Sequence, residues 1–228
     1  MTLAPAYTAA QVRAAEAPLL AAGEPLMDRA AAALAAVLRR EITPGGRVLV
    51  LAGRGDNGGD ALLAGAALAA EGIGVDVLQT ADAAHERGLG TALAAGARPV
   101  TLQQAAAADP AYDLIVDGIV GIGASADPAL RGGARAAVEQ LLPAVRSGRS
   151  RAVAVDIPSG VQPDDGSVGD DMVLPAAVTV TFGAVKAGLI RGSGAHLAGR
   201  VVLVDLGLNL SPEYSVATGD IERFDDIA

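Results

Sequence analysis

Carboxylate and amide side chains follow short apolar stretches at three places in this sequence. They are Asp56, Asn57 and Asp60 at the first place, Asp117 at the second and Asp156 at the third. Each apolar stretch has the length and the branched residues of a strand buried in a parallel sheet. Because ligands of open parallel sheets bind at the carboxyl ends of the strands, we expect these side chains to share one pocket. Carboxyl groups in such a pocket are suited to proton transfer.

The first place is a glycine-rich turn that would also suit a phosphate-bearing ligand. Gly53, Gly55 and Gly58 have the spacing of the dinucleotide-binding motif. A dehydrogenase also needs an acid at the tip of the second strand, and neither Asp76 nor Asp82 is well placed for it. The acids of the turn would repel a pyrophosphate, and no Gly-Lys-Ser/Thr ends the turn, which excludes a P-loop. The glycine spacing keeps an NAD(P)-dependent oxidoreductase open as an alternative, although the acids speak against it. A non-catalytic nucleotide-binding or scaffold module is a further alternative.

Three residues of these turns offer only oxygen as a metal ligand: Asn57, Asp117 and Ser159. Oxygen donors suit a hard cation, and a single carboxylate among them favours a weakly held monovalent ion over Mg²⁺. The competing explanation is that Asp117 and Asp156 only cap the turns that follow their strands. Three coincident loops favour a site over three independent caps.

Lys186 is a further candidate, because it lies after a predicted strand in a glycine-flanked turn. A lone lysine of this kind is often a surface residue without a role. Arg191 and His196 are weaker candidates, and Met27 lies at helical spacing on an apolar stripe, which predicts a core position.

Alternating apolar strands and helical segments must hold these residues in place. The pattern predicts an α/β fold, a Rossmann-like three-layer sandwich with a mostly parallel central sheet, helices on both faces and two extra N-terminal helices. The expected helices span residues 9–22, 24–40, 60–71, 82–96 and 131–146; the expected strands span 48–52, 75–79, 114–118, 152–156, 178–182 and 201–205, with a short extended piece at 99–101. We expect one domain over residues 1–210. Residues 211–228 are expected to form a peripheral acidic tail or the start of a linker to a further domain.

The composition excludes several classes of function. The net charge of −9, with scattered Arg and Lys, argues against a nucleic-acid partner. The absence of cysteine excludes disulfides and thiolate chemistry, and His85 and His196 form no zinc motif. No uninterrupted apolar run is long enough to span a membrane, and the first residues lack the features of a signal peptide. A cytoplasmic protein without a membrane partner is the expectation.

Together these motifs resemble the NAD(P)H-hydrate epimerases, also called the YjeF N-terminal domain. The resemblance covers roughly residues 7–210 and is carried by the order of its motifs, which is more specific than any one of them. They are residues 56–60, Asp117 with 121–123, residues 156–160, residues 181–188, the two leading helices with Leu26 and Met27, and the closing segment 199–207. Two positions depart from the usual family motif: Asp56 stands where the family has Asn, and Ala61 where it has Gly.

The resemblance implies an isomerase that repairs NADH and NADPH hydrated at C6 of the nicotinamide ring. It would interconvert the R and S epimers for a partner dehydratase, which some bacterial members carry fused at their C-terminal side. One potassium ion per subunit would be bound by Asn57, Asp117 and Ser159, and members of the family often form homodimers. The substrate would contact Asp56, Asn57, Gly58, Gly59, Asp60, Gly121, Ile122, Gly123, Ala124, Ser125, Ala126, Asp127 and Asp156.

The reaction implied by the resemblance requires proton carriers. The lone pair of ring N1 can expel the neighbouring C6 hydroxyl once that hydroxyl is protonated, and water can then add to either face. This sequence of steps needs an acid and a base within hydrogen-bonding reach. Our hypothesis is that Asp156 and Lys186 share these catalytic roles.

Overall fold

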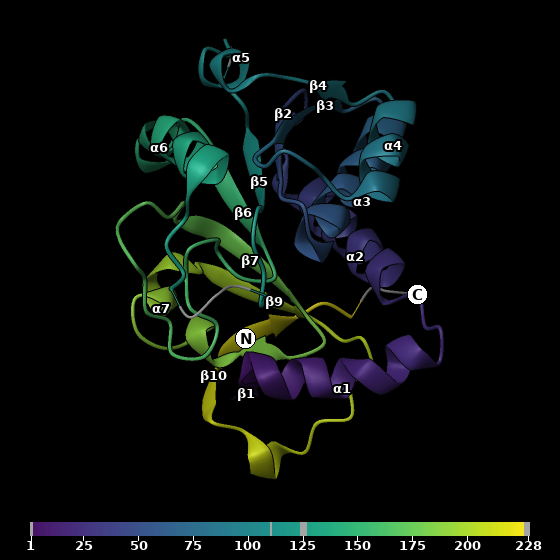
Figure 1. Cartoon of the computed structure of the whole chain (residues 1–228), viewed down its shortest axis with the longest axis vertical. Coiled ribbons are helices and arrows are strands. Elements are labelled where there is room, and N and C mark those ends of the chain that lie inside the picture. The colour runs from purple at the N-terminus through teal and green to yellow at the C-terminus, as the bar shows by residue number, and fades with distance from the viewer. Residues whose placement is uncertain (1, 110, 124–126, 226–228) are drawn as a thin grey trace.

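A computed structural model describes residues 2–109, 111–123 and 127–225 of the chain. Its strands form one sheet, and helices pack against that sheet (Figure 1). In chain order they are β1 (Thr2–Tyr7), α1 (Ala9–Ala21), α2 (Leu26–Glu41), β2 (Arg47–Ala52), α3 (Asp56–Ala70), β3 (Gly74–Gln79), α4 (Glu86–Ala94), β4 (Arg98–Pro99), α5 (Leu102–Ala106), β5 (Leu114–Gly118), α6 (Gly132–Arg146), β6 (Arg151–Val155), β7 (Ala176–Phe182), β8 (Val185–Lys186), α7 (Gly194–Leu197), β9 (Arg200–Val204) and β10 (Ala217–Arg223), with 3-10 turns at Ala187–Leu189 and Pro212–Tyr214.

The sheet has the strand order β4-β3-β2-β5-β6-β7-β9-β10-β1-β8 in the part of the chain that the structure describes. All strands from β4 to β10 in this order pair in parallel, and β1 pairs antiparallel with β10. The predicted α/β fold with a mostly parallel sheet is confirmed. The parallel arrangement brings the carboxyl ends of β2, β5 and β6 to one edge, where the predicted site residues follow.

The two faces of the sheet are covered by different helices. Along β2 the side chains alternate, as the period of a strand requires. Val48, Val50 and Ala52 belong to the core under α2, α3 and α4, whereas Leu49 and Leu51 belong to the core under α5 and α6. Figure 1 shows α6 on one side of the strands and α2, α3 and α4 on the other. The predicted helices on both faces are confirmed. They cover the faces of the sheet and not the carboxyl ends of its strands.

The two N-terminal helices have different surroundings. Helix α2 packs against α3 and β7, and its Leu34 and Leu38 are fully buried. Helix α1 begins with the predicted capping box of Thr8 and Gln11, and buries only Ala9 and Val12. Most of α1 is therefore available to line a cavity rather than to fill the core.

One prediction was wrong at the C-terminal side. The sequence predicts a peripheral tail after residue 210, but residues 217–223 form β10, a strand inside the sheet between β9 and β1. Ile221 is the one buried residue of the strand and Phe224 just after it is also buried, whereas the other residues of β10 are half-buried or exposed. The polar sequence of this segment gives no strand pattern, because β10 is stabilised by backbone pairing with β1 more than by apolar side chains.

A second correction concerns the start of α3. The sequence predicts a helix that begins at Asp60, after a glycine-rich turn, but the helix begins at Asp56 with Gly55 as the N-cap. A side chain at Gly58 would place its Cβ 2.1 Å from the carbonyl oxygen of Gly53, so this helical position has no room for another residue. The glycines serve close packing of the helix against the strand end.

No helix among the described residues is long and apolar enough to cross a membrane.

Candidate active site

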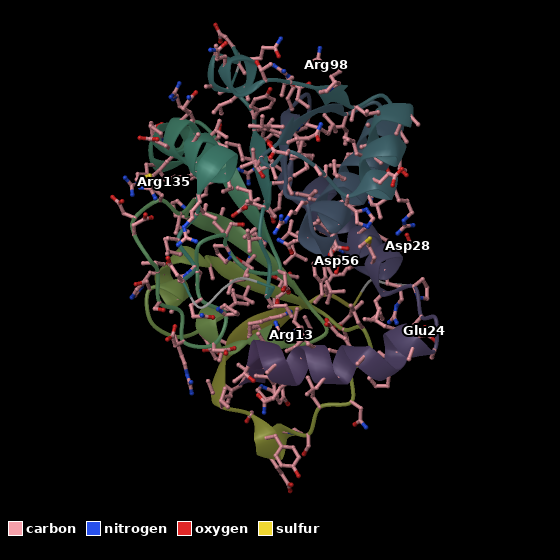
Figure 2. The ribbon with its side chains drawn as sticks, in the orientation of Figure 1. Arg13, Glu24, Asp28, Asp56, Arg98 and Arg135 are labelled. Atoms are coloured by element: carbon pink, nitrogen blue, oxygen red, sulfur yellow. The ribbon has the colours of Figure 1, made fainter. Side chains whose placement is uncertain are left out.

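A cavity of about 1050 Å³ opens at the carboxyl ends of β2, β5 and β6. Its walls come from α1, α2, the first turn of α3, the loop after β5 and the loop that carries Asp156. Arg13 of α1 and Asp56 of α3, both labelled in Figure 2, line this cavity. The structure thus brings Asp56, Asn57, Asp60 and Asp156 into the lining of one cavity, as the strand-end argument predicted.

Asp156 occupies an unusual backbone conformation. Its φ is 68°, the only positive φ of a non-glycine residue in the described part of the chain. Such a conformation is strained and persists where the surrounding structure enforces it, often at functional sites. Its Oδ1 accepts hydrogen bonds from Lys186 Nζ, from Thr181 Oγ1 at 3.2 Å and from the Phe182 N–H at 3.4 Å. These hydrogen bonds fix the carboxylate of Asp156, which belongs to the lining of the cavity.

Lys186 lies behind Asp156 and is fully buried, with 1% of its surface exposed. Its ammonium donates to Asp156 Oδ1, to Phe182 O at 2.8 Å and to Thr181 Oγ1 at 3.2 Å. Three acceptors use the three protons of an ammonium group. Asp156 lines the cavity, whereas Lys186 is not among the lining residues. Sequence reasoning placed Lys186 in a turn, but it ends strand β8 and acts as the charge partner of Asp156.

Asp60 is buried in the wall of the same cavity, in the second turn of α3. Its Oδ1 is the one buried side-chain nitrogen or oxygen without a hydrogen-bond partner among the residues that the structure describes. Burial raises the pKa of Asp60 well above its ordinary value, and the negative charges of Asp156, Asp56 and Glu16 raise it further. Burial among these negative charges therefore favours the protonated, neutral form of this carboxyl group more than in an exposed aspartate.

Asp117 and Ser159 form a second buried group at the ends of β5 and β6. The Ser159 hydroxyl donates to Asp117 Oδ1 at 2.6 Å, and the Ser159 N–H donates to Asp117 Oδ2 at 2.9 Å. Burial raises the pKa of Asp117, and these hydrogen bonds from Ser159 oppose the rise. A third donor is the N–H of Ile119 at 3.3 Å, so the groups that donate to this carboxylate in the described part of the chain are neutral.

Asn57 joins this group from α3. Its Nδ2 donates to the carbonyl oxygen of Val155 at 2.9 Å, which fixes the amide. A Cβ built at Gly121 would lie 2.8 Å from Asn57 Oδ1, so the loop after β5 passes directly over that oxygen. Ser159 Oγ also lies 3.2 Å from the carbonyl oxygen of Val120 in the same loop. The three predicted ion ligands therefore all adjoin the loop after β5.

The predicted substrate loop 121–127 is described only in part. Gly121, Ile122, Gly123 and Asp127 line the cavity, whereas residues 124–126 (Ala124, Ser125 and Ala126) lie outside the described residues. Asp127 forms an ion pair with Arg131. Of the remaining predicted contacts, Asp56, Asn57 and Asp60 line the cavity, and Gly58 and Gly59 are buried in the first turn of α3 between them.

Sequence reasoning missed the contribution of α1. Arg13 donates to the carbonyl oxygen of Ile122 at 2.6 Å, and Glu16 lines the cavity beside it. Burial raises the pKa of Glu16 as well. Arg54, in the turn after β2, is a further lining residue. These residues follow no strand-end pattern, and the only signal for α1 was its scarcity of apolar residues beyond alanine.

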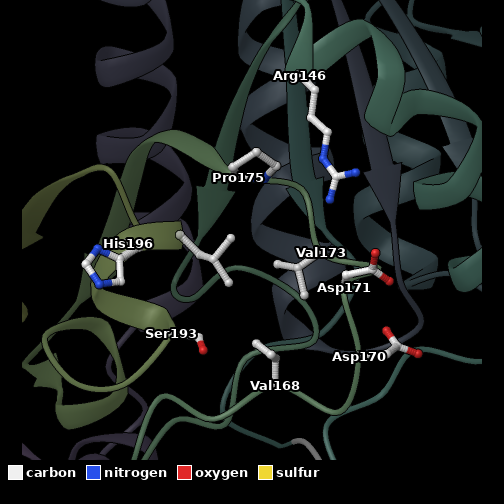
Figure 3. Close-up of a pocket in the computed structure, with 9 residues that line it drawn as sticks. Arg146, Val168, Asp170, Asp171, Val173, Pro175, Ser193 and His196 are labelled. Carbon is white, nitrogen blue, oxygen red and sulfur yellow. The ribbon is translucent and has the colours of Figure 1, made fainter.

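A second cavity of about 440 Å³ lies away from the strand ends just described. Figure 3 shows Asp170 and Asp171 on one side of it and His196 on the other. Arg146, at the end of α6, is a further lining residue, and Asp170 is engaged in an ion pair with Arg135. His196 and Asp156 thus do not share a cavity, and the weak candidacy of His196 gains no support.

A family model and individual relatives both place this chain in the same protein family. Residues 23–188 match the family model described as YjeF-related protein N-terminus. The NAD(P)H-hydrate epimerase of Microbacterium testaceum is 58% identical over 204 residues, which are 89% of this chain and 78% of the relative. The NAD(P)H-hydrate epimerase of Clavibacter michiganensis is 57% identical, over 92% of this chain and 93% of the relative.

Two further relatives differ in size or in sequence. The bifunctional NAD(P)H-hydrate repair enzyme Nnr of Mycobacterium tuberculosis is 41% identical over 90% of this chain, which spans only 42% of that enzyme. Among solved structures, that of the yeast protein ynu0 (YNL200c) superposes with a TM-score of 0.68 at 21% identity, covering 80% of this chain and 82% of the yeast chain. The yeast structure supports the fold alone.

Proposed function

This chain belongs to the family of YjeF-related protein N-termini, and we propose that it is an NAD(P)H-hydrate epimerase. It is an isomerase that interconverts the R and S epimers of NADH and NADPH hydrated at C6 of the nicotinamide ring. The observation that carries the proposal is Asp156, whose strained backbone and hydrogen-bonded carboxylate lie in the lining of a large cavity with further acids. Relatives that are more than half identical over most of the chain bear the name of this activity.

The cavity suits a nucleotide as the substrate rather than as a cofactor. Its volume is at the upper end of the range for small-molecule sites. The N-terminus of α3 lines it, and backbone N–H groups at a helix N-terminus favour anionic ligands such as phosphates. Arg13 and Arg54 add positive charge to the lining. We expect the phosphates to lie toward these groups and the hydrated ring toward Asp156.

We assign the role of the base to Asp156. Its carboxylate lines the cavity and is held by Lys186, Thr181 and the Phe182 N–H. Lys186 supplies the compensating positive charge, so we assign it a positioning role and no proton transfer of its own. The sequence suggested that Asp156 and Lys186 share the roles of acid and base, and this proposal keeps only Asp156 as a proton carrier.

The proposal includes a potassium ion held by Asn57, Asp117 and Ser159. The residue types suit such an ion, because they offer amide, carboxylate and hydroxyl oxygens and all three adjoin the loop after β5. The fully buried Asp117 carboxylate has neutral hydrogen-bond donors, and a monovalent cation would balance its charge. When bound, the ion would order the loops after β2, β5 and β6.

Other parts of the proposal concern the surroundings of the enzyme. A dehydratase that accepts one epimer is the expected functional partner, and the similarity to a bifunctional NAD(P)H-hydrate repair enzyme supports this link. A homodimer and a cytoplasmic location are further expectations of the proposal.

The oxidoreductase alternative loses support at β3. Asp76, an acid in the second predicted strand, accepts hydrogen bonds from Arg47 at 2.7 Å, Arg98 at 2.9 Å and Tyr112 at 2.8 Å. It is buried and engaged on the strand, and it is not among the lining residues of the cavity. It is therefore not available to bind the ribose of a dinucleotide cofactor.

The proposal is tested by supplying the purified R hydrate of NADH together with a dehydratase that is specific for the S epimer. We expect this protein to accelerate the loss of the R hydrate, and potassium to increase the rate over a buffer with a bulky organic cation. Absence of acceleration in both buffers would overturn the proposed function. Acceleration that is equal in both buffers would leave the epimerase and remove the potassium ion.

A further inference from the structure

Asp60 is a buried acid in the cavity wall, and a bound substrate could supply the partner that its side chain lacks in the part of the chain that the structure describes. Its side chain lines the cavity, and its Oδ1 has no partner among the described residues, although nearly every buried polar atom in a folded protein is hydrogen-bonded. An unpartnered buried oxygen is destabilising and calls for an explanation. A catalytic role would explain it, and such a role rests on the proposed epimerase function.

Asp60 and Asp156 approach the cavity from strands that are not neighbours. Asp60 follows β2 and Asp156 follows β6, with β5 between them in the sheet (Figure 1). Helix α3 carries Asp60 and also contacts β6, and the charge of Asp156 acts on Asp60, so the two carboxyl groups serve the same cavity. In the inferred binding mode the nicotinamide ring lies between them and presents one face to each. Epimerisation at one carbon requires that opposite faces be served.

The groups around Asp60 distinguish it from Asp156. Asp56 from the same helix, Glu16 from α1 and Asp156 from the loop after β6 all act on it with negative charge. Next to Asp60, a Cβ built at Gly59 would lie 2.9 Å from the ring of His85, before α4, and 3.1 Å from Cε of Met27 in α2. The positive charge of Lys186 also acts on Asp60, but Lys186 is already paired with Asp156. In the part of the chain that the structure describes, Asp156 thus has a paired cation and Asp60 has none.

We propose that Asp60 is a catalytic acid, which donates a proton to the departing C6 hydroxyl, and that Asp156 accepts a proton from the water that returns on the opposite face. The two carboxyl groups form a two-sided acid–base pair around the nicotinamide ring. Lys186 stabilises the negative charge of Asp156, whereas Asp60 is buried in the wall of the cavity and is surrounded by other acids.

The step balances without a further reactant. The C6–O bond breaks with its electron pair on oxygen, which takes the proton of Asp60 and leaves as water, while the lone pair of N1 forms the N1=C6 iminium. Water then forms a new C–O bond on the other face, the π electrons return to N1, and Asp156 takes the extra proton. One proton has moved from Asp60 to Asp156, and it returns through solvent or through the reverse reaction.

The assignment is tested with Asp60→Asn and Asp60→Glu in the full chain, using the R hydrate of NADH and an excess of the S-specific dehydratase. Asp82→Asn is the matched control, because Asp82 is exposed, follows β3 and is not part of the cavity lining. We expect Asp60→Asn to lower kcat by about 10²–10⁴-fold, the usual contribution of a general acid, with little change in KM. Asp60→Glu should retain part of the activity, and Asp82→Asn all of it.

The pH profile separates catalysis from a structural role. Wild-type kcat should fall as the pH rises, because an ionised Asp60 has no proton to donate. Asp60→Glu should keep this fall at a shifted pH, and the residual rate of Asp60→Asn should lack it. Near-wild-type kcat in folded Asp60→Asn would overturn the assignment. So would a wild-type profile without an alkaline fall, even if Asp60→Asn could not be purified.

The same assay keeps this assignment apart from the proposed function. Wild-type protein that does not interconvert the epimers would overturn the proposed function and the assignment together. Active wild-type protein with an unaffected Asp60→Asn variant would overturn the assignment alone.

Discussion

The two ends of the parallel sheet arrange their charged side chains in opposite ways. At the amino-terminal end, the strands β2, β4, β6 and β9 each begin with an arginine. Their ion pairs are Arg47 and Arg98 with Asp76, Arg151 with Glu41 and Asp113, and Arg200 with Glu41 and Glu222. At the carboxyl end, acids gather around a single buried lysine, Lys186.

The difference between the two ends is clearest in two buried acids, Asp76 and Asp60. Asp76 is 2% exposed and accepts hydrogen bonds from two arginines and from Tyr112. Asp60 is 8% exposed, yet its Oδ1 has no partner among the described residues. Burial alone therefore does not distinguish a structural acid from a functional one. At the amino-terminal end the buried acid is neutralised by arginines, whereas the carboxyl end keeps an unsatisfied acid in the wall of the cavity.

Breaking the Lys186–Asp156 pair should have the largest effect on this comparison. Lys186→Met leaves the buried Asp156 carboxylate without its cation, and we expect a loss of about 3–5 kcal/mol in the free energy of unfolding. Epimerisation should fall by about 10²–10⁴-fold in the protein that remains folded, because the base loses its fixed position. Urea denaturation and the coupled dehydratase assay measure the two effects.

A double variant provides the control. Lys186→Met combined with Asp156→Asn removes both charges, and asparagine tolerates the positive φ of position 156. We expect most of the lost stability to return and the activity to stay absent. Activity in the double variant would contradict the role of Asp156 as the base.

Asp76→Asn tests the opposite end of the sheet. The amide removes the charge that Arg47, Arg98 and Tyr112 share, and the two arginines are exposed enough to turn toward water. We expect a loss of about 2–3 kcal/mol in the free energy of unfolding, which is the usual range for hydrogen bonds to a charged group. The kcat of the folded variant should equal that of wild type. A lowered kcat would show that the two ends of the sheet are coupled.

The sequence was informative where side-chain pattern and backbone structure agree. The strand ends at Asp117 and Asp156 were predictable, because an apolar run followed by an acid has one simple place in a parallel sheet. The potassium ligands and the substrate loop came from the family resemblance, and they stay predictions. Strands β1 and β10 were missed, because they stabilise each other across more than two hundred residues and neither is strongly apolar.

Within the candidate site, residue types were predictable and their surroundings were not. Lys186 was singled out, but its burial behind Asp156 depends on β8 pairing with β1, which no local pattern indicates. Asp60 was expected to bind substrate, but the missing partner of its Oδ1 depends on packing between α1, α2 and α3. Glu16 had no signal at all, because α1 reaches the site only through the tertiary fold.

Asp60→Asn should also change stability, in the direction opposite to the previous variants. An acid whose folded pKa lies above its unfolded value binds more protons when folded, so stability is lost as the pH rises from the unfolded to the folded pKa. Removing that acid should raise the free energy of unfolding by roughly 0.5–2 kcal/mol at about pH 8, as is common for substitutions at functional sites. The gain should vanish as the pH approaches the ordinary value of 3.8. A gain that is independent of pH would contradict the ionisation argument.

The smallest effect is expected at Glu41, at the amino-terminal end. Its carboxylate links Arg151 and Arg200, the first residues of β6 and β9, and both arginine side chains are more than one-third exposed. Exposed pairs contribute little, so Glu41→Gln should lower the free energy of unfolding by about 0.2–1 kcal/mol. Because salt screens exposed charges, the difference from wild type should shrink in urea titrations at about 1 M salt. The Lys186→Met difference should persist there, since burial protects that pair from screening. If both differences shrank equally, the distinction between an exposed structural network and a buried reactive one would fail.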